Sequence, residues 1–172
     1  ISMDRLSAIN NIRNLLKTSK CSLGSWIQIP SSSVAEIMGN SGYDWVAVDL
    51  EHGAITLNQL PDLFRALELG GTLPLVRLAE GNSKDCKSVM DAGAGGVIIP
   101  MIENADQLKQ IISWCSWPPS GNRGIGFSRA NLFGKNFVKY NEEAQSPFVV
   151  AMIVNINAVK NLKQILRVNG LD

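Results

Sequence analysis

The chain has 172 residues, with 16 lysines and arginines against 15 aspartates and glutamates, and a formal net charge of +1. This balance gives no electrostatic reason to expect a nucleic-acid or membrane-surface partner, and no apolar run approaches the roughly 18 residues of a membrane-spanning helix. Three widely spaced cysteines, Cys21, Cys86 and Cys115, argue against a disulfide framework or a CxxC zinc site. We therefore expect one globular domain over residues 1–172, in a reducing, cytoplasmic setting.

Hydrophobic periodicity predicts an amphipathic N-terminal helix followed by alternating strands and helices. In chain order these are strand 23–29, helix 31–42, strand 45–49, helix 56–69, strand 73–78, helix 83–92, strand 96–102, helix 104–114, strand 148–153 and helix 157–168. Ser31, Thr56 and Asn104 are the expected N-caps. Residues 117–147 break the pattern and, being rich in glycine and proline at their start, predict a long ordered loop.

Five successive strand–helix units with apolar strands are typical of a parallel sheet covered by helices. Two architectures fit this pattern, a doubly wound open sheet and a (β/α)8 barrel. Length favours the open sheet, since a barrel needs eight units and about 250 residues. The polar residues at the strand ends do not favour it.

Polar side chains follow the predicted strands, where parallel α/β folds build their sites. They are Trp26 and Gln28 after the first strand, Asp49, Glu51 and His52 after the second, Arg77 in the third and Glu103 after the fourth. His52 is the only histidine of the chain and stands between carboxylates and Gly53. An imidazole accepts a proton near neutral pH, and a carboxylate fixes its tautomer, so His52 is a candidate general base. The alternative is a purely structural histidine.

Arg77 interrupts an apolar strand, where an unpartnered charge is costly. Its planar fork suits a substrate carboxylate or a developing enolate oxygen, and the alternative is an internal ion pair with Asp49 or Glu51. Asp91 is equally open, because it can close its own helix or reach across to His52.

Several motifs together resemble one family. They are the run 42–53 (GYDWVAVDLEHG), Leu75-Val76-Arg77, the run 97–102 (VIIPMI) and the run 118–126 (PPSGNRGIG), with 157–166 and 170–172 extending the match. From about residue 22 to 172 the chain resembles the HpcH/HpaI aldolases. The resemblance implies a (β/α)8 TIM barrel, present here as about its first five units. It also implies a class II pyruvate aldolase, which uses a divalent metal to cleave a 4-hydroxy-2-oxo acid into pyruvate and an aldehyde.

Residue by residue, the resemblance places the base at His52 and its acidic partner at Asp91. Asp49 is expected near a metal-bound water, Arg77 on the pyruvate oxygens and Trp26 in the pocket wall. The mechanism implied is Lewis-acid catalysis, in which the metal stabilises the enolate.

The resemblance also implies that the 117–147 loop lies on the active-site side, with Arg123 over the substrate. The expected partners are a small 2-oxo acid and further copies of the chain in a homo-oligomer, with the site near a subunit interface. Mg²⁺ or Mn²⁺ suits the oxygen ligands of such a site.

One departure from the family bears on the metal. In the aligned run Met152-Ile153-Val154, valine occupies the position of a glutamate ligand, and valine cannot coordinate a metal. The family's second ligand, an aspartate, is expected a few residues beyond Asp172. This leaves no intact metal ligand among the 172 residues.

The resemblance thus implies a carbon–carbon lyase of the aldehyde-lyase type. The alternative is an impaired homologue that binds a small 2-oxo acid or carboxylate without turnover. A third interpretation is a lyase of acyl-thioesters, but the sequence offers no basic patch for the phosphates of coenzyme A.

Overall fold

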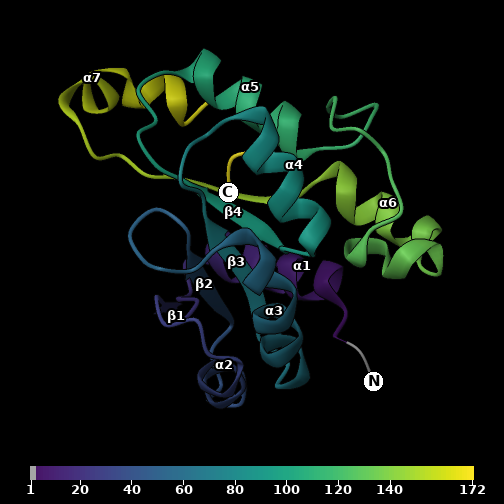
Figure 1. Ribbon diagram of the computed structural model, residues 1–172. Helices are drawn as coiled ribbons and strands as arrows, with labels where there is room; N and C mark the ends of the chain where they lie inside the picture. Colours follow the sequence, from purple (N-terminus) through teal and green to yellow (C-terminus); the bar gives the residue numbers. More distant parts are fainter. Residues whose placement is uncertain (1–2) are drawn as a thin grey trace.

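A five-stranded parallel sheet forms the centre of the computed structural model, which describes residues 3–172 (Figure 1). The strands are β1 (Gly24–Ile27), β2 (Trp45–Asp49), β3 (Leu73–Arg77), β4 (Gly96–Ile99) and β5 (Phe148–Ala151). They lie side by side in chain order. A doubly wound sheet reverses its strand order part-way, whereas a barrel wall runs in sequence. The strand order therefore identifies the sheet as part of a barrel wall. The open sheet, which the chain length favours, is the wrong architecture.

Helices join and flank the strands as the sequence predicts. They are α1 (Arg5–Lys17), α2 (Ser32–Gly39), the 3₁₀ turn η1 (Leu57–Gln59), α3 (Leu60–Leu69), α4 (Ser83–Ala92), α5 (Ala105–Cys115), η2 (Arg129–Gly134), α6 (Phe137–Gln145) and α7 (Ile156–Ile165). Ser31 and Asn104 accept N-cap hydrogen bonds, and Thr56 forms a capping box with Gln59. No helix in the described part of the chain is long and apolar enough to cross a bilayer.

The 117–147 segment differs from its prediction because it contains η2 and α6. The sequence of α6, FVKYNEEAQ, is mostly polar, so periodicity does not reveal it. Tyr140 and Ala144, one turn apart, are buried against the indole of Trp117. Tertiary packing on that tryptophan therefore stabilises a helix whose own pattern is weak.

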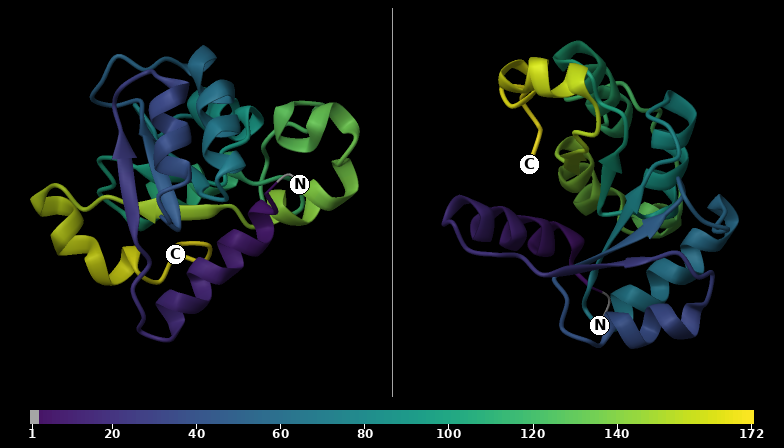
Figure 2. Two further views of the ribbon diagram at one scale, coloured as in Figure 1. Left: turned by 90° about the horizontal axis from the view of Figure 1, so that it is seen from below. Right: turned by 90° about the vertical axis from the view of Figure 1, so that its left-hand side faces the viewer.

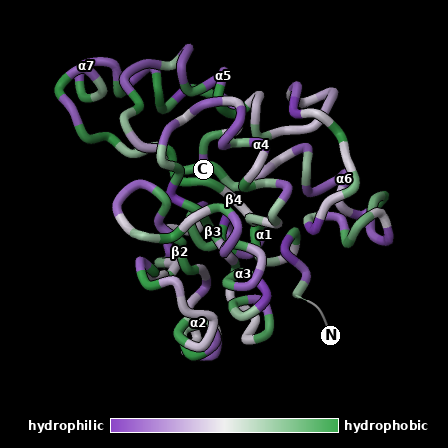
Figure 3. The backbone as a smooth tube through the Cα atoms, viewed as in Figure 1, coloured by the Kyte–Doolittle hydropathy of each residue, from purple (hydrophilic) through white to green (hydrophobic). Residues whose placement is uncertain are grey.

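The alternation of side chains along the strands separates two hydrophobic layers. Val46, Val48 and Val76 belong to the layer shared with α3, α4 and α5, whereas Leu75 and Ile98 belong to the opposite layer. There, Ile9 and Ile12 of α1 are completely buried. Figure 2 shows α1 crossing this second face, and Figure 3 shows the strands as the hydrophobic centre of the chain.

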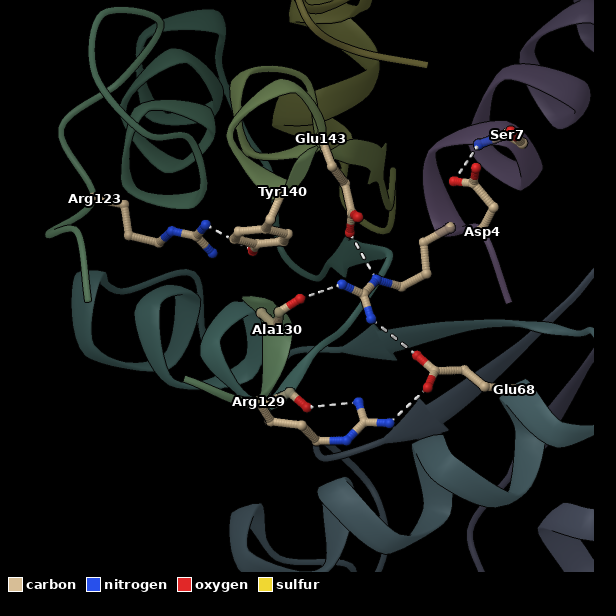
Figure 4. Close-up of polar contacts among 10 residues, drawn as sticks. Asp4, Ser7, Glu68, Arg123, Arg129, Ala130, Tyr140 and Glu143 are labelled. Carbon is tan, nitrogen blue, oxygen red and sulfur yellow. Dashed lines mark hydrogen bonds and ion pairs between the residues drawn. The ribbon is translucent and has the colours of Figure 1, made fainter. Parts of the chain in front are cut away.

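A buried ionic network fixes the start of α1. Arg5 donates to Glu143 of α6 at 2.7 Å, to Glu68 of α3 at 3.1 Å and to the carbonyl of Ala130 at 2.6 Å. Arg129 approaches Glu68 from its other side at 2.6 Å (Figure 4). Burial alone would lower the pKa of Arg5, but the two carboxylates hold it above its ordinary value. Arg5 therefore stays charged and joins α1, α3 and α6.

Replacing Arg5→Met should lower the free energy of unfolding by about 3 kcal/mol, because Glu143 is left buried without its charged partner. The double variant Arg5→Met/Glu143→Leu should lose less than the single one, since it buries no unpaired carboxylate. Urea denaturation measures both. Lys139→Met, which removes only the exposed pair with Asp4, is the control and should change stability by less than about 1 kcal/mol. Equal losses for Arg5→Met and Lys139→Met would contradict the role of the network.

Candidate active site

Asp49 and Arg77 are direct register partners at the carboxyl ends of β2 and β3. Their side chains form a two-point ion pair, in which Arg77 Nε donates to Asp49 Oδ1 at 2.8 Å and Nη2 donates to Oδ2. Asp49 is completely buried, and the side chain of Arg77 is 12% exposed. The internal ion pair left open by the sequence is thus present, and it lies at the sheet edge where α/β folds build their sites.

Asp49 accepts five hydrogen bonds in all. Beside the two from Arg77, Oδ1 accepts the backbone N–H groups of Glu51 at 3.0 Å and His52 at 3.2 Å, and Oδ2 accepts Gln28 Nε2 at 2.7 Å. Burial by itself would raise the pKa of Asp49, but these donors outweigh it and hold that pKa well below the usual range. Asp49 is therefore a permanent carboxylate that organises the turn after β2.

Arg77 has further partners around its planar group. Its Nη1 lies 3.1 Å from Glu51 Oε2, and its Cζ lies 5.1 Å from the ring centroid of Trp26. The hydrogen bonds and charge of Asp49 raise the pKa of Arg77. Of the five N–H donors of a guanidinium, Asp49 takes two, and the other three are carried by the terminal nitrogens. Because Nη1 also faces Glu51, two of those three donors remain for an anionic ligand that lies against Trp26.

His52 lies on the same edge, in the turn that Asp49 organises. Its side chain is 71% exposed, and its Nε2 is 3.8 Å from Glu51 Oε1, which is longer than a hydrogen bond. The carboxylate of Glu51 thus faces both Arg77 and the imidazole. The predicted juxtaposition of Trp26, Asp49, His52 and Arg77 is present.

Asp91 and Arg123 lie apart from this group. Because α4 and α5 run back from the carboxyl edge of the sheet, their last turns, with the loop after α5, lie at the opposite edge. Arg123 is buried there, donates to the hydroxyl of Tyr140 at 2.8 Å (Figure 4) and lies against the ring of Trp117. The expectation that this loop covers the Arg77 edge is therefore not met within one copy of the chain.

Asp91, in the last turn of α4, makes no hydrogen bond or ion pair with His52 in the structure of residues 3–172. Its Oδ1 is buried without a hydrogen-bond partner among those residues. Burial raises the pKa of Asp91, against the opposing charges of Arg123 and Lys87. The predicted pairing of Asp91 with His52 is thus not formed within one copy.

The side chains at the carboxyl edge do not fit a divalent metal ion. Val154, just after β5, offers only an aliphatic group, and it is 51% exposed. Asp49 and Glu51 are both paired with Arg77, while Glu103 accepts a hydrogen bond from Asn155 at 3.2 Å. Across the described residues, no three His, Cys, Asp or Glu side chains converge as a metal ion requires.

Comparison with known proteins shows the family to which the chain belongs. The sequence profile of the HpcH/HpaI aldolase/citrate lyase family matches residues 22–172. The chain belongs to this family. A solved HpcH/HpaI aldolase/citrate lyase family protein from Burkholderia cenocepacia superimposes with a TM-score of 0.86 at 27% identity, over 95% of this chain and 66% of that one. The fold is therefore the TIM-barrel type of the HpcH/HpaI proteins.

Two curated relatives carry aldolase names. The hydroxypyruvate/pyruvate aldolase of Roseobacter denitrificans is 32% identical over 95% of this chain and 65% of its own length. The 4-hydroxy-2-oxovalerate aldolase of Novosphingobium aromaticivorans is 35% identical over 95% of this chain and 63% of its own length. The chain thus spans a little under two thirds of these HpcH/HpaI relatives.

Sequence reasoning gave no role to Gln28, which the structure joins to Asp49. Its position directly after β1, level with the polar residues after β2, is the signal that could have identified it. The role of Glu51 as the second partner of Arg77 was left as an alternative.

Asp49→Asn should lower the free energy of unfolding by about 2–3 kcal/mol at neutral pH, because it removes the charge that pairs with Arg77. An aspartate with a depressed pKa contributes stability that is complete above its ordinary pKa of 3.8 and is lost as pH falls through the lower, folded value. Urea denaturation between about pH 7 and pH 3 should therefore show a constant difference from wild type that shrinks only below about pH 4.

Asp62→Asn, which changes an exposed carboxylate of α3, is the matched control and should cost less than about 1 kcal/mol. A loss for Asp49→Asn that already disappears at about pH 6 would mean that the Asp49 carboxylate is not stabilised by its donors.

Proposed function

We propose that this HpcH/HpaI chain binds a 2-oxo acid at Arg77 and serves as a carbon–carbon lyase that cleaves a 4-hydroxy-2-oxo acid into pyruvate and an aldehyde. The observation that supports this most is the Asp49–Arg77 pair at the sheet edge, with His52 on the adjoining turn. The names of the two curated relatives, both aldolases of oxo acids, point to the same substrate class.

Arg77 is suited to the acid end of such a substrate. Asp49 holds one edge of the guanidinium and Glu51 faces Nη1, which leaves two N–H donors of the terminal nitrogens for the carboxylate and 2-oxo oxygens. The same donors stabilise the negative charge that develops on the 2-oxo oxygen when an enolate forms. Trp26 lies against the guanidinium and provides an apolar wall for the carbon chain of the substrate.

His52 supplies the base in this proposal. Its exposed imidazole removes the proton of the C4 hydroxyl, the C3–C4 bond breaks, and the bonding electrons pass to C3 as the enolate of pyruvate. The aldehyde departs with the C4 oxygen as its carbonyl. The protonated His52 then delivers its proton to C3 and gives pyruvate, so atoms and charge balance without a further reactant.

A second candidate is a protein that binds a 2-oxo acid at Arg77 without turnover. Val154 favours it, because the family resemblance implies a carboxylate ligand at that position and an aliphatic side chain cannot replace one. The two candidates share the binding step and differ in whether bound pyruvate forms an enolate.

Enolate formation can be measured directly by the exchange of pyruvate methyl protons with D2O, followed by NMR. His52→Ala should slow this exchange by about 10²-fold or more, because a positioned base is lost, while pyruvate binding is retained. Arg77→Lys should instead weaken pyruvate binding about tenfold, since lysine lacks the planar fork. Arg65→Lys, on the exposed side of α3, is the matched control and should alter neither quantity.

Binding without exchange in the wild-type chain would select the second candidate. Wild-type protein that does not bind pyruvate would contradict both. Exchange that survives His52→Ala unchanged would remove His52 as the base.

Val154→Glu tests whether the valine accounts for the missing metal ligand. The variant should bind Mn²⁺ at least about tenfold more tightly than wild type, because it adds a carboxylate at the edge that already holds Glu103. Electron paramagnetic resonance of free Mn²⁺ measures the binding. Val159→Glu, which places the same charge on an exposed position of α7, is the control. Equal affinities of the two variants would show a nonspecific effect of charge.

A further inference from the structure

One side-chain amide joins β1 to the turn that carries His52. Gln28, the residue after β1, donates from Nε2 to Asp49 Oδ2 at 2.7 Å and to the backbone carbonyl of His52 at 2.6 Å. A primary amide has two N–H donors, so both bonds form at once and use its full donor capacity. The amide thus holds both ends of the segment from Asp49 to His52.

The backbone of His52 is consequently held on both sides. Its N–H donates to Asp49 Oδ1 at 3.2 Å, and its carbonyl accepts Gln28 Nε2. Asp49 is immobile in turn, because it is buried and paired with Arg77. Gln28, directly after β1, is the member of this arrangement that lies outside the β2–β3 pair. It therefore fixes the height of the turn relative to the sheet edge.

The imidazole itself has little other support. It is 71% exposed, and Glu51 Oε1 is beyond hydrogen-bond distance from its Nε2 at 3.8 Å. The position of such a ring follows the position of its backbone. A displacement of about 1 Å is enough to cost a catalytic group a large part of its effect.

We propose that Gln28 is the positioning residue for His52, acting through the two hydrogen bonds to Asp49 and to the His52 carbonyl. This proposal rests on the proposed function for its kinetic consequence, but its structural consequence is independent of activity. Gln28 does not bind substrate in this account, and we expect Arg77 to keep its two bonds to Asp49 when Gln28 is changed.

The test uses Gln28→Met, which preserves length and removes both donors. The rate of pyruvate methyl exchange should fall about tenfold, while the dissociation constant for pyruvate changes less than twofold. Gln110→Met is the matched control, since Gln110 is exposed on α5 and its side chain has no hydrogen bond to another described residue. Gln28→Glu, of the same shape but with acceptors only, should reproduce the loss and provides a second variant if the first is unstable.

A second measurement does not depend on turnover. Relaxation of ¹⁵N in the backbone amides of residues 51–53 should show ordered amides in wild type and in Gln110→Met. Both Gln28 variants should lose that order while the strands keep it. His52 is the only histidine, so its ring signals are assigned without ambiguity and report the same change.

The two measurements separate the possible failures. If wild-type protein performs no exchange, the proposed function fails, and the relaxation of residues 51–53 still decides whether Gln28 positions His52. Unchanged order in that turn overturns the proposal. Weakened pyruvate binding at an unchanged exchange rate also overturns it, because Gln28 then acts through Arg77.

Discussion

The ion pair between Asp49 and Arg77 is the interaction on which the carboxyl edge of the sheet depends. It joins two neighbouring strands at matching register positions and places a charge pair where both strands are otherwise apolar. Because Asp49 remains ionised, its carboxylate also accepts hydrogen bonds from the backbone N–H groups of the next turn. A single buried carboxylate thus determines the orientation of the arginine and the course of the backbone toward His52. The side chains at this edge are thus positioned by a structural requirement, because the buried charge of Asp49 must be compensated by Arg77.

The opposite edge of the sheet has a different organisation. Arg5, Glu68, Arg129 and Glu143 form a second charged network there, built from helices and not from strand ends. Each charged group in this network faces a partner of opposite sign. The long segment after α5 belongs to this edge and contributes packing through Trp117 and Tyr140. The ion pair at the carboxyl ends of the strands thus joins two strands, whereas the network at the other end joins helices.

Sequence patterns predicted the helices, strands and site residues that depend on the local sequence. They missed the features that depend on contacts between residues far apart in the chain. Apolar runs and capping residues predicted every strand and the helices α1 to α5 and α7, and the strand ends predicted Trp26, Asp49, His52 and Arg77 as neighbours. The helix α6 escaped because its stability comes from Trp117, more than twenty residues away. Asp91 and Arg123 were placed by resemblance, and their location follows from the return direction of α4 and α5. Gln28 needed the pairing of β1 with β2 to acquire a role.

The attachment of α1 has a consequence for how the chain acquires its structure. Successive strands pair with their nearest neighbours in sequence, so the sheet can grow one unit at a time. The arginines of α1 are different, because Arg5 pairs with Glu143, 138 positions further along, and Arg13 pairs with Asp172, 159 positions further along. Because synthesis runs from the N-terminus to the C-terminus, α1 is made well before Glu143, and its charged end is satisfied only after that residue has been made. The helix α1 thus precedes the sheet in synthesis, but its ion pair with α6 can form only after all five strands but the last have been made.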